Sequence, residues 1–295
     1  MSIEGFAITP EDEDLAGAEH APATVRTHTH ALFPSVFVHG IRFAVLSDEY
    51  CINHVLQELD AGRGGTIITL NLDHLRRCGE DPSYRALVER AEVNVADGMP
   101  IVWASRLQRT PLPQRVAGSD LINSLASAAA ESGYSVFLLG GNPGTAEATS
   151  RLLCRRYPRL RVAGWHDPRP GFDQNPQSLA ATINLVRDAA PDIVFVALGS
   201  PKQEQFIHSA RQALPGTWWL GVGISFSFMC GEIRRAPRWM QRAGLEWIHR
   251  LSQEPGKLFR RYLVHGLPFA VKLLGAAVMN GILRRARSER GSLGG

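Results

Sequence analysis

The chain has 295 residues, 44% of them hydrophobic, so it can bury a substantial core, and one large domain with appendages is expected. Its net charge of +4 is unevenly spread, because residues 234–290 hold 13 Lys and Arg against three acids while the remainder is acidic overall. Such a basic end suits phosphates, nucleic acid or an anionic membrane. The four scattered cysteines form no C-x-x-C pair and are expected to be reduced, as in a cytosolic protein, and neither a signal peptide nor a clear transmembrane helix is predicted.

Residues 1–31 contain an acidic cluster with Ala, Pro and Thr but little periodicity, which predicts a disordered N-terminal tail. Order is expected from Val36, with two short strands that turn at His39-Gly40 and then a helix with Ser47 as its N-cap. Further along, short apolar runs predict buried strands at 66–70, 93–95, 136–139, 160–163, 193–197 and 218–222.

Strands that alternate with helices at this spacing predict βαβ units. The fold class is therefore α/β, a mostly parallel sheet with helices on both faces, over residues 32–231. From residue 232 onward Arg, Trp and Pro dominate, and helices are predicted at 237–245, at 246–253 and from Lys257. Residues 232–295 are thus expected to form a basic helical appendage.

Four polar or glycine-rich segments follow predicted strands: Thr69-Leu70-Asn71, Asp97, Gly140–Gly144 and Gly199–Gln203. Since the carboxyl ends of parallel strands share one edge of the sheet, a ligand crevice is expected there. Each segment also has a simpler explanation, because glycines permit tight turns and Asn or Asp often caps a helix. For Asp97 alone, a helix cap and a catalytic carboxylate are equally good interpretations.

The basic appendage offers Arg250, Arg260 and Arg261, whose guanidinium groups can bind diphosphate oxygens in pairs. A solvated basic face is the alternative. The apolar stretch 262–283 is interrupted by Gly, Pro and charged residues and precedes Arg284-Arg285. It is expected to lie on an anionic membrane or, equally well, to pack on the core.

Taken together, these motifs resemble the WecG/TagA/CpsF family of bacterial glycosyltransferases, glycosyltransferase family 26. The resemblance spans about residues 36–262 and is carried, in order, by Thr69-Leu70-Asn71, Ala96-Asp97-Gly98, Arg115–Leu121, Phe137–Gly141, Leu198–Glu204, Gly221-Val222-Gly223, Arg235-Ala236-Pro237, Gly244–Trp247, Glu254-Pro255 and Arg260-Arg261-Tyr262.

The resemblance implies a Rossmann-like body of the GT-E type with a C-terminal appendage that docks on the membrane and completes the site. It implies inverting transfer of a hexose from a UDP-sugar to a polyprenyl-diphosphate-linked sugar, without a cofactor or a required metal. By resemblance Asp97 is the general base. Thr69, Asn71, Arg115 and Gln203 match substrate-pocket positions, and Arg250, Arg260 and Arg261 match arginines that steady the leaving diphosphate.

One position departs from the family pattern. Where relatives commonly carry an acid between two phenylalanines, this chain has Ser227 between Phe226 and Phe228. The departure puts any ribose or acceptor contact at this position in doubt, and it slightly favours UDP-glucose over UDP-N-acetylmannosamine as donor, in exopolysaccharide assembly.

The expected location is the cytoplasm, attached peripherally to the inner face of the cell membrane, with no nucleic-acid partner. Exposed apolar surface near the appendage could pair two copies as a homo-oligomer. One rival hypothesis is a nucleotide-dependent oxidoreductase, disfavoured because the glycine spacing is not G-x-G-x-x-G. The other is a non-catalytic adaptor that binds membrane or nucleic acid, disfavoured by the concentration of polar motifs at strand ends.

Overall fold

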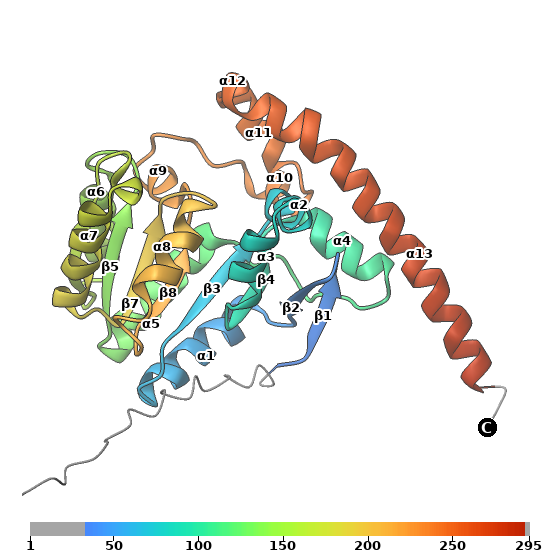
Figure 1. Ribbon diagram of the computed structural model, residues 1–295, viewed down its shortest axis with the longest axis horizontal. Coiled ribbons are helices and arrows are strands. Elements are labelled where there is room, and N and C mark those ends of the chain that lie inside the picture. The colour runs from blue at the N-terminus through green and yellow to red at the C-terminus, as the bar shows by residue number, and fades with distance from the viewer. Residues whose placement is uncertain (1–32, 293–295) are drawn as a thin grey trace, which may run out of the picture. The chain divides into compact units, whose positions relative to one another are not determined.

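A central six-stranded sheet organises the residues that the computed structural model describes, 33–292 (Figure 1). Its strand order is β4-β3-β8-β7-β5-β6, and every neighbouring pair is parallel. The strands are β3 (Gly65–Leu70), β4 (Val93–Ala96), β5 (Ser135–Gly140), β6 (Arg161–His166), β7 (Ile193–Ala197) and β8 (Trp218–Gly221). The predicted parallel sheet is therefore confirmed, and the predicted tail at 1–31 lies outside the described residues.

Helices cover both faces of this sheet. Successive side chains along each strand point to opposite faces, and each face has its own hydrophobic core. Ile67 and Val136 belong to one cluster, whereas Ile68 and Phe137 belong to clusters on the opposite face. The first face is covered by α1 (Asp48–Asp60), α5 (Gly118–Ser132) and α6 (Thr145–Arg156). The second is covered by α2 (Leu72–Glu80), α3 (Pro82–Glu89), α4 (Met99–Leu107), α7 (Pro176–Ala189) and α8 (Lys202–Ala210).

A separate two-stranded antiparallel sheet, β1 (Ser35–Val38) and β2 (Ile41–Ala44), packs into the core beneath α4. Its turn is at His39 and Gly40, as predicted, and both residues have positive φ. The predicted cap of α1 is also present, since the Ser47 side chain accepts a hydrogen bond from the Tyr50 N–H at 3.3 Å.

After β8 the chain forms several short helices and one long helix, and these pack on the α/β body. These are α9 (Ser225–Met229), α10 (Arg238–Arg242), α11 (Glu246–Gln253), α12 (Pro255–Phe259), the π-helical segment Arg260–Gly266 and α13 (Leu267–Ser292). Residues from Phe33 onward group as one compact unit, and the appendage is part of it. The helical appendage expected after residue 231 is therefore present, packed on the α/β body.

One face of α13 packs along α4, where Leu273 and Ala277 are each only 3% exposed. The contact is close at Gly281, because a Cβ atom there would collide with the carbonyl oxygen of Leu107. The rest of the helix leaves large apolar side chains exposed, such as Val271 and Met279. Both interpretations of this stretch thus apply in part: one face is core and another is exposed and apolar.

Although no clear transmembrane helix is predicted from the sequence, one segment has the length and composition of a membrane span. Within the described residues, Pro255–Arg287 forms a continuous helical run of 33 residues that is long and apolar enough to span a membrane. Pro268 does not interrupt the run, because it is the second residue of α13, which follows the π-helical segment Arg260–Gly266, and proline is tolerated in the first turn of a helix.

Candidate functional site

The candidate site lies at the carboxyl edge of the sheet, where β3 and β4 end side by side. Asp97 follows β4, and its backbone N–H donates to the carbonyl oxygen of Leu70 at the end of β3, at 2.8 Å. Its side chain is 26% exposed, so the carboxylate is partly buried yet reachable. Helix α4 is capped at Gly98 without a side-chain hydrogen bond. Asp97 therefore does not cap α4, and the simpler of its two interpretations is wrong.

Arg115 stands beside Asp97 because a backbone hydrogen bond holds its loop against the end of β4. The N–H of Val116 donates to the carbonyl oxygen of Ala96 at 2.8 Å, so the loop that carries Arg115 runs along the end of β4. Arg115 Nη1 lies 3.5 Å from Asp97 Oδ1 and 3.2 Å from Glu246 Oε2. Two positions predicted from sequence, Asp97 and Arg115, are thus in direct contact.

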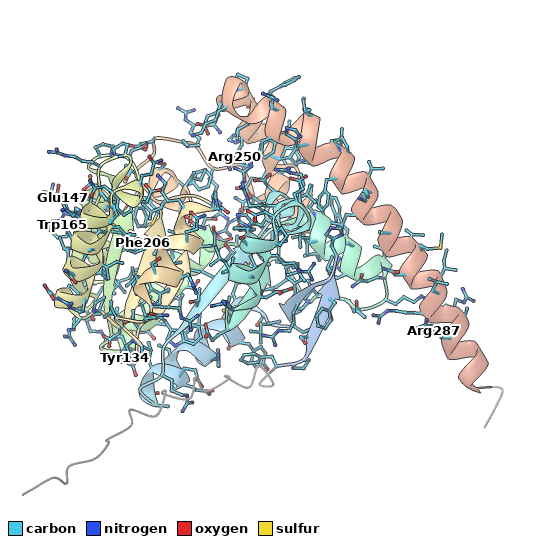
Figure 2. The ribbon with its side chains drawn as sticks, viewed as in Figure 1. Tyr134, Glu147, Trp165, Phe206, Arg250 and Arg287 are labelled. Carbon is cyan, nitrogen blue, oxygen red and sulfur yellow. The ribbon has the colours of Figure 1, made fainter. Side chains whose placement is uncertain are left out.

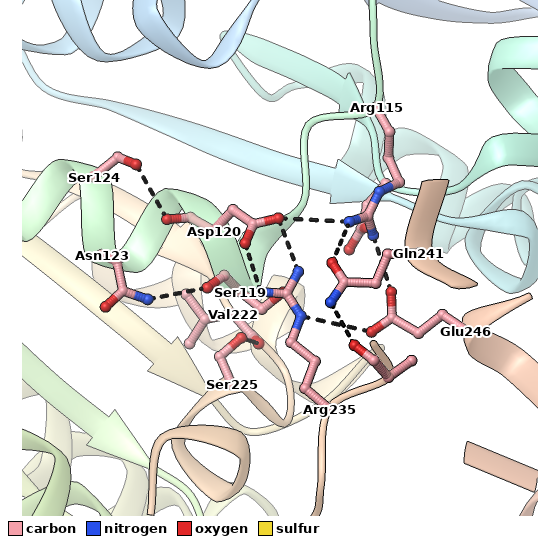
Figure 3. A network of polar contacts seen from close by, with 12 residues as sticks. Arg115, Ser119, Asp120, Asn123, Ser124, Val222, Ser225, Arg235, Gln241 and Glu246 are labelled. Atoms are coloured by element: carbon pink, nitrogen blue, oxygen red, sulfur yellow. Dashed lines mark hydrogen bonds and ion pairs between the residues drawn. The ribbon is translucent and has the colours of Figure 1, made fainter. Parts of the chain in front are cut away.

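A network of charges extends from Arg115 into the appendage (Figure 3). Arg115 Nη2 lies 3.5 Å from Asp120 Oδ2 and 3.3 Å from Gln241 Oε1. Arg235 holds both oxygens of Asp120, at 2.5 and 2.8 Å, and its Nε is 3.7 Å from Glu246 Oε1. Three carboxylates therefore surround two guanidinium groups, and the appendage supplies one member of each kind.

The surroundings make Asp97 unusually basic for a carboxylate. The pKa of Asp97 is raised to about 6, mainly by burial and also by the nearby carboxylates of Glu246 and Asp120, although Arg115 and the backbone N–H of Gly118 act in the opposite direction. Asp120 behaves differently: although burial raises its pKa, the bidentate contact with Arg235 together with Arg115 holds that pKa below its usual range. Asp97 is thus suited to accept a proton near neutral pH, and Asp120 stays ionised.

The end of β3 contributes Thr69 and Asn71. Thr69 is 6% exposed, and its Oγ1 lies 3.0 Å from where a Cβ at Gly118 would be, so a larger residue at this position of α5 would displace the Thr69 side chain. The Oδ1 atom of Asn71 accepts hydrogen bonds from the N–H groups of Asp73 and His74, which makes Asn71 the N-cap of α2. The capping alternative therefore holds for Asn71, although its amide nitrogen is not used by the cap.

Gln203 is buried at the start of α8, where it joins β7 to the loop after β8. Its Oε1 accepts from the N–H of Gly223 at 3.2 Å, and its Nε2 donates to Glu204 Oε1 at 2.8 Å. Only 4% of Gln203 is exposed. Both ends of this carboxamide are therefore bonded within the chain, and Gln203 fixes the backbone at Gly223.

The three appendage arginines predicted from sequence are placed differently from one another. Arg261 reaches the body and pairs with Asp73 Oδ2 at 3.3 Å, near the N-terminus of α2. Arg250 of α11, labelled in Figure 2, pairs with Glu254 at 3.6 Å, and its guanidinium group lies over the Phe228 ring. Arg260 is exposed, and none of the residues described pairs with it. Arg250 and Arg261 both lie within electrostatic reach of Tyr262, as do Glu246 and Asp73.

A carboxylate stands next to Ser227, the position where the family pattern has an acid. Ser227 Oγ donates to Glu232 Oε2 at 2.8 Å, and Asn142 Nδ2 donates to the same oxygen at 2.8 Å. Asn142 belongs to the glycine-rich turn between β5 and α6. Glu232 thus brings negative charge to the place that Ser227 leaves neutral.

Several residues of this site were not assigned a role from the sequence, namely Asp120, Glu232, Arg235, Gln241 and Glu246. Three of them stand within the motifs that carry the family resemblance, which was the available signal. Among the residues described, no group of three or more His, Cys, Asp or Glu side chains is arranged to hold a metal ion.

Comparison with known proteins identifies the family. The model of the "Glycosyl transferase WecG/TagA/CpsF family" matches residues 36–281. A relative from Bacillus spizizenii, named N-acetylglucosaminyldiphosphoundecaprenol N-acetyl-beta-D-mannosaminyltransferase, is 35% identical over 205 residues, which cover 70% of this chain and 77% of the relative. The chain therefore belongs to the WecG/TagA/CpsF family of glycosyltransferases.

Proposed function

We propose that this enzyme is an inverting glycosyltransferase that moves a hexose from a UDP-sugar to a polyprenyl-diphosphate-linked sugar, in the synthesis of bacterial exopolysaccharide or another cell-surface polysaccharide. The observation that carries the proposal is Asp97, a partly exposed carboxylate of raised pKa at the carboxyl edge of the sheet. The name of the Bacillus relative supports the acceptor class, because that enzyme is named for a sugar on diphosphoundecaprenol.

In the proposed reaction Asp97 takes the proton from the acceptor hydroxyl as its oxygen attacks the anomeric carbon of the donor. The new C–O bond forms on the face opposite to UDP, and the bond to the UDP oxygen breaks with its electron pair, so the configuration inverts. The departing diphosphate gains negative charge, which Arg250, Arg260 and Arg261 would stabilise in place of a metal ion.

The remaining sequence-predicted residues support the substrate pocket in different ways. Thr69 and Asn71 stand at the end of β3 next to Asp97, and the free amide nitrogen of Asn71 can donate to a sugar oxygen. Arg115 orients Asp97. Gln203 acts through the backbone at Gly223, because both of its polar ends are occupied.

Membership of a glycosyltransferase family sets aside both rival hypotheses, the nucleotide-dependent oxidoreductase and the non-catalytic adaptor. For the donor, two observations point in different directions. The name of the relative favours UDP-N-acetylmannosamine. Ser227 favours UDP-glucose, but the adjacent Glu232 weakens that argument because it restores a carboxylate.

The direct test is product formation by the purified full-length enzyme with a panel of UDP-sugars and a synthetic polyprenyl-diphosphate-linked sugar, with EDTA present. We expect a lipid-linked product with one donor, an inverted anomeric centre by NMR, and no loss of rate in EDTA. Complete loss of activity in EDTA, restored by a divalent cation, would contradict the metal-independent mechanism. Absence of transfer with every donor would contradict the function.

We further propose that the enzyme attaches peripherally to the inner face of the cell membrane through the exposed apolar side of α13. Val278, Met279 and Ile282 are exposed there, and Arg284 follows them as a cation for anionic lipid. The packing of Leu273 and Ala277 on α4 favours attachment over insertion, because a spanning helix would have to leave α4. Pairing of two copies through exposed apolar surface near the appendage stays a prediction.

Full-length enzyme is expected to co-sediment with vesicles that contain anionic phospholipid and to be released by high salt. Ile282→Glu should weaken this binding, whereas Leu185→Glu, at an exposed apolar position on α7, should not. If salt and alkaline carbonate leave the protein in the pellet and only detergent releases it, the helix spans the membrane and peripheral attachment is wrong.

A further inference from the structure

Arg115 is shared among several acceptors and does not form a closed pair with Asp97. Its Nη1 lies nearer to Glu246 Oε2, at 3.2 Å, than to Asp97 Oδ1, at 3.5 Å. Its Nη2 lies between Asp120 and Gln241, at 3.5 and 3.3 Å. Among the described contacts, the guanidinium group thus reaches Asp97 through Nη1 alone.

This sharing matters because a bidentate arginine–carboxylate pair is a strong contact that holds the carboxylate in its ionised form. A carboxylate held in that way is a weak base. Arg115 could approach Asp97 more closely if Glu246 did not draw Nη1 toward itself. We propose that Glu246 is a positioning residue, which holds Arg115 away from a closed pair with Asp97 and so leaves Asp97 free to accept a proton.

The members of this arrangement come from two parts of the chain. Asp97, Arg115 and Asp120 belong to the α/β body, whereas Glu246 is the first residue of α11 in the appendage. Arg235, also from the appendage, occupies both oxygens of Asp120 and so keeps Asp120 from drawing Arg115 fully to its side. Seating of the appendage therefore sets the basicity of a carboxylate in the body.

The charged groups that face Asp97 are Arg115, Glu246, Asp120 and Arg235. Neutralising Glu246 removes a negative charge close to Asp97 and frees Arg115 for it, and both changes favour the ionised carboxylate. The direction is therefore unambiguous: without the Glu246 charge Asp97 should bind its proton less tightly.

The test is Glu246→Gln in the full-length enzyme, which keeps the size of the side chain and removes only its charge. The inference rests on the proposed role of Asp97, so two readouts are needed. In the pH profile of kcat/KM, the fall at acidic pH is expected to shift to lower pH by about one unit. At pH values above this fall, kcat should drop several-fold. Carbon-13 NMR titration of the Asp97 carboxyl, assigned with Asp97→Asn, should likewise move to lower pH. Thermal melting checks that the variant folds.

The control is Glu147→Gln on α6, whose partner is Arg151 and which lies at the left edge of the view, away from Arg250 of α11 (Figure 2). It should change neither readout. If Glu246→Gln leaves both the fall of kcat/KM at acidic pH and the Asp97 titration unchanged, the inference is overturned. If the Asp97 titration moves but Asp97→Asn remains active, Glu246 positions Arg115 as inferred, and it is the base assignment that fails.

Discussion

Asp97→Asn is expected to lower kcat by about 10²–10⁴-fold, the usual contribution of a general base. Asparagine has the size of aspartate and does not disturb α4, which Asp97 does not cap. It cannot take the proton of the acceptor hydroxyl, so the loss should appear in kcat more than in the affinity for the donor. The measurement is transfer to a lipid-linked acceptor by the purified variant, and Asp188→Asn on the exposed side of α7 is the matched control. Near-full activity of Asp97→Asn would remove Asp97 as the base.

The same carboxylate fixes the expected pH dependence. Burial raises the pKa of Asp97 to about 6, and the base works only when ionised. For the wild-type enzyme, kcat/KM should therefore be level above this value and fall as the pH drops through about 6, by tenfold for each further pH unit. A profile that stays level down to pH 4.5 would show that no such carboxylate takes part.

Arg261→Ala is expected to lower kcat by about 10²–10³-fold, as the loss of one preorganised donor to a developing anion typically does. Arg261 is the appendage arginine that reaches the body, where the Asp73 carboxylate holds it near the end of β3. Without it the charge that develops on UDP loses a fixed partner. The rate of transfer and the inhibition constant of UDP are the quantities to measure.

Two further variants serve as a control and a comparison for Arg261→Ala. Arg151→Ala removes an exposed arginine on α6 that pairs with Glu147, and it should leave the rate unchanged. Arg260→Ala should cost less than Arg261→Ala, because no contact with the described residues holds Arg260 in place. Equal rates for Arg261→Ala and the wild-type enzyme would exclude Arg261 from leaving-group stabilisation.

Much of the fold follows from local sequence. The β-branched run that became β3 and the apolar run 193–197 that became β7 are buried on both faces, which is why they could be recognised without partners. Strand order could not be predicted, because parallel neighbours are joined by long crossovers and the pattern within a strand does not specify its neighbour. A helix was predicted from Lys257 onward and is present, but its π-helical segment Arg260–Gly266 was not predicted, because such a segment leaves no periodic signal in the sequence.

For the site, position along a strand was more informative than residue type. Asp97 and Thr69 could be placed at one edge because Thr69 lies near the carboxyl end of one predicted strand and Asp97 follows another, and the structure pairs these two strands. Glu246 could not be placed in this way, since it contacts Arg115 across 131 positions of the chain. Its role depends on how the appendage packs, and helical periodicity alone does not show which body residues a helix end will meet.

The position of β8 in the sheet has a consequence for how the enzyme is assembled. β8 is the last strand in sequence, yet it lies between β3 and β7 and is the link between the β4-β3 pair and the β7-β5-β6 group. During synthesis the two halves therefore stay unjoined until residue 218 has left the ribosome. Asp97 and Thr69 belong to the first half and Gln203 to the second, so the pocket is completed only when that late strand inserts. A nascent chain arrested before β8 should then present two separate sheet edges, which are a natural substrate for chaperones.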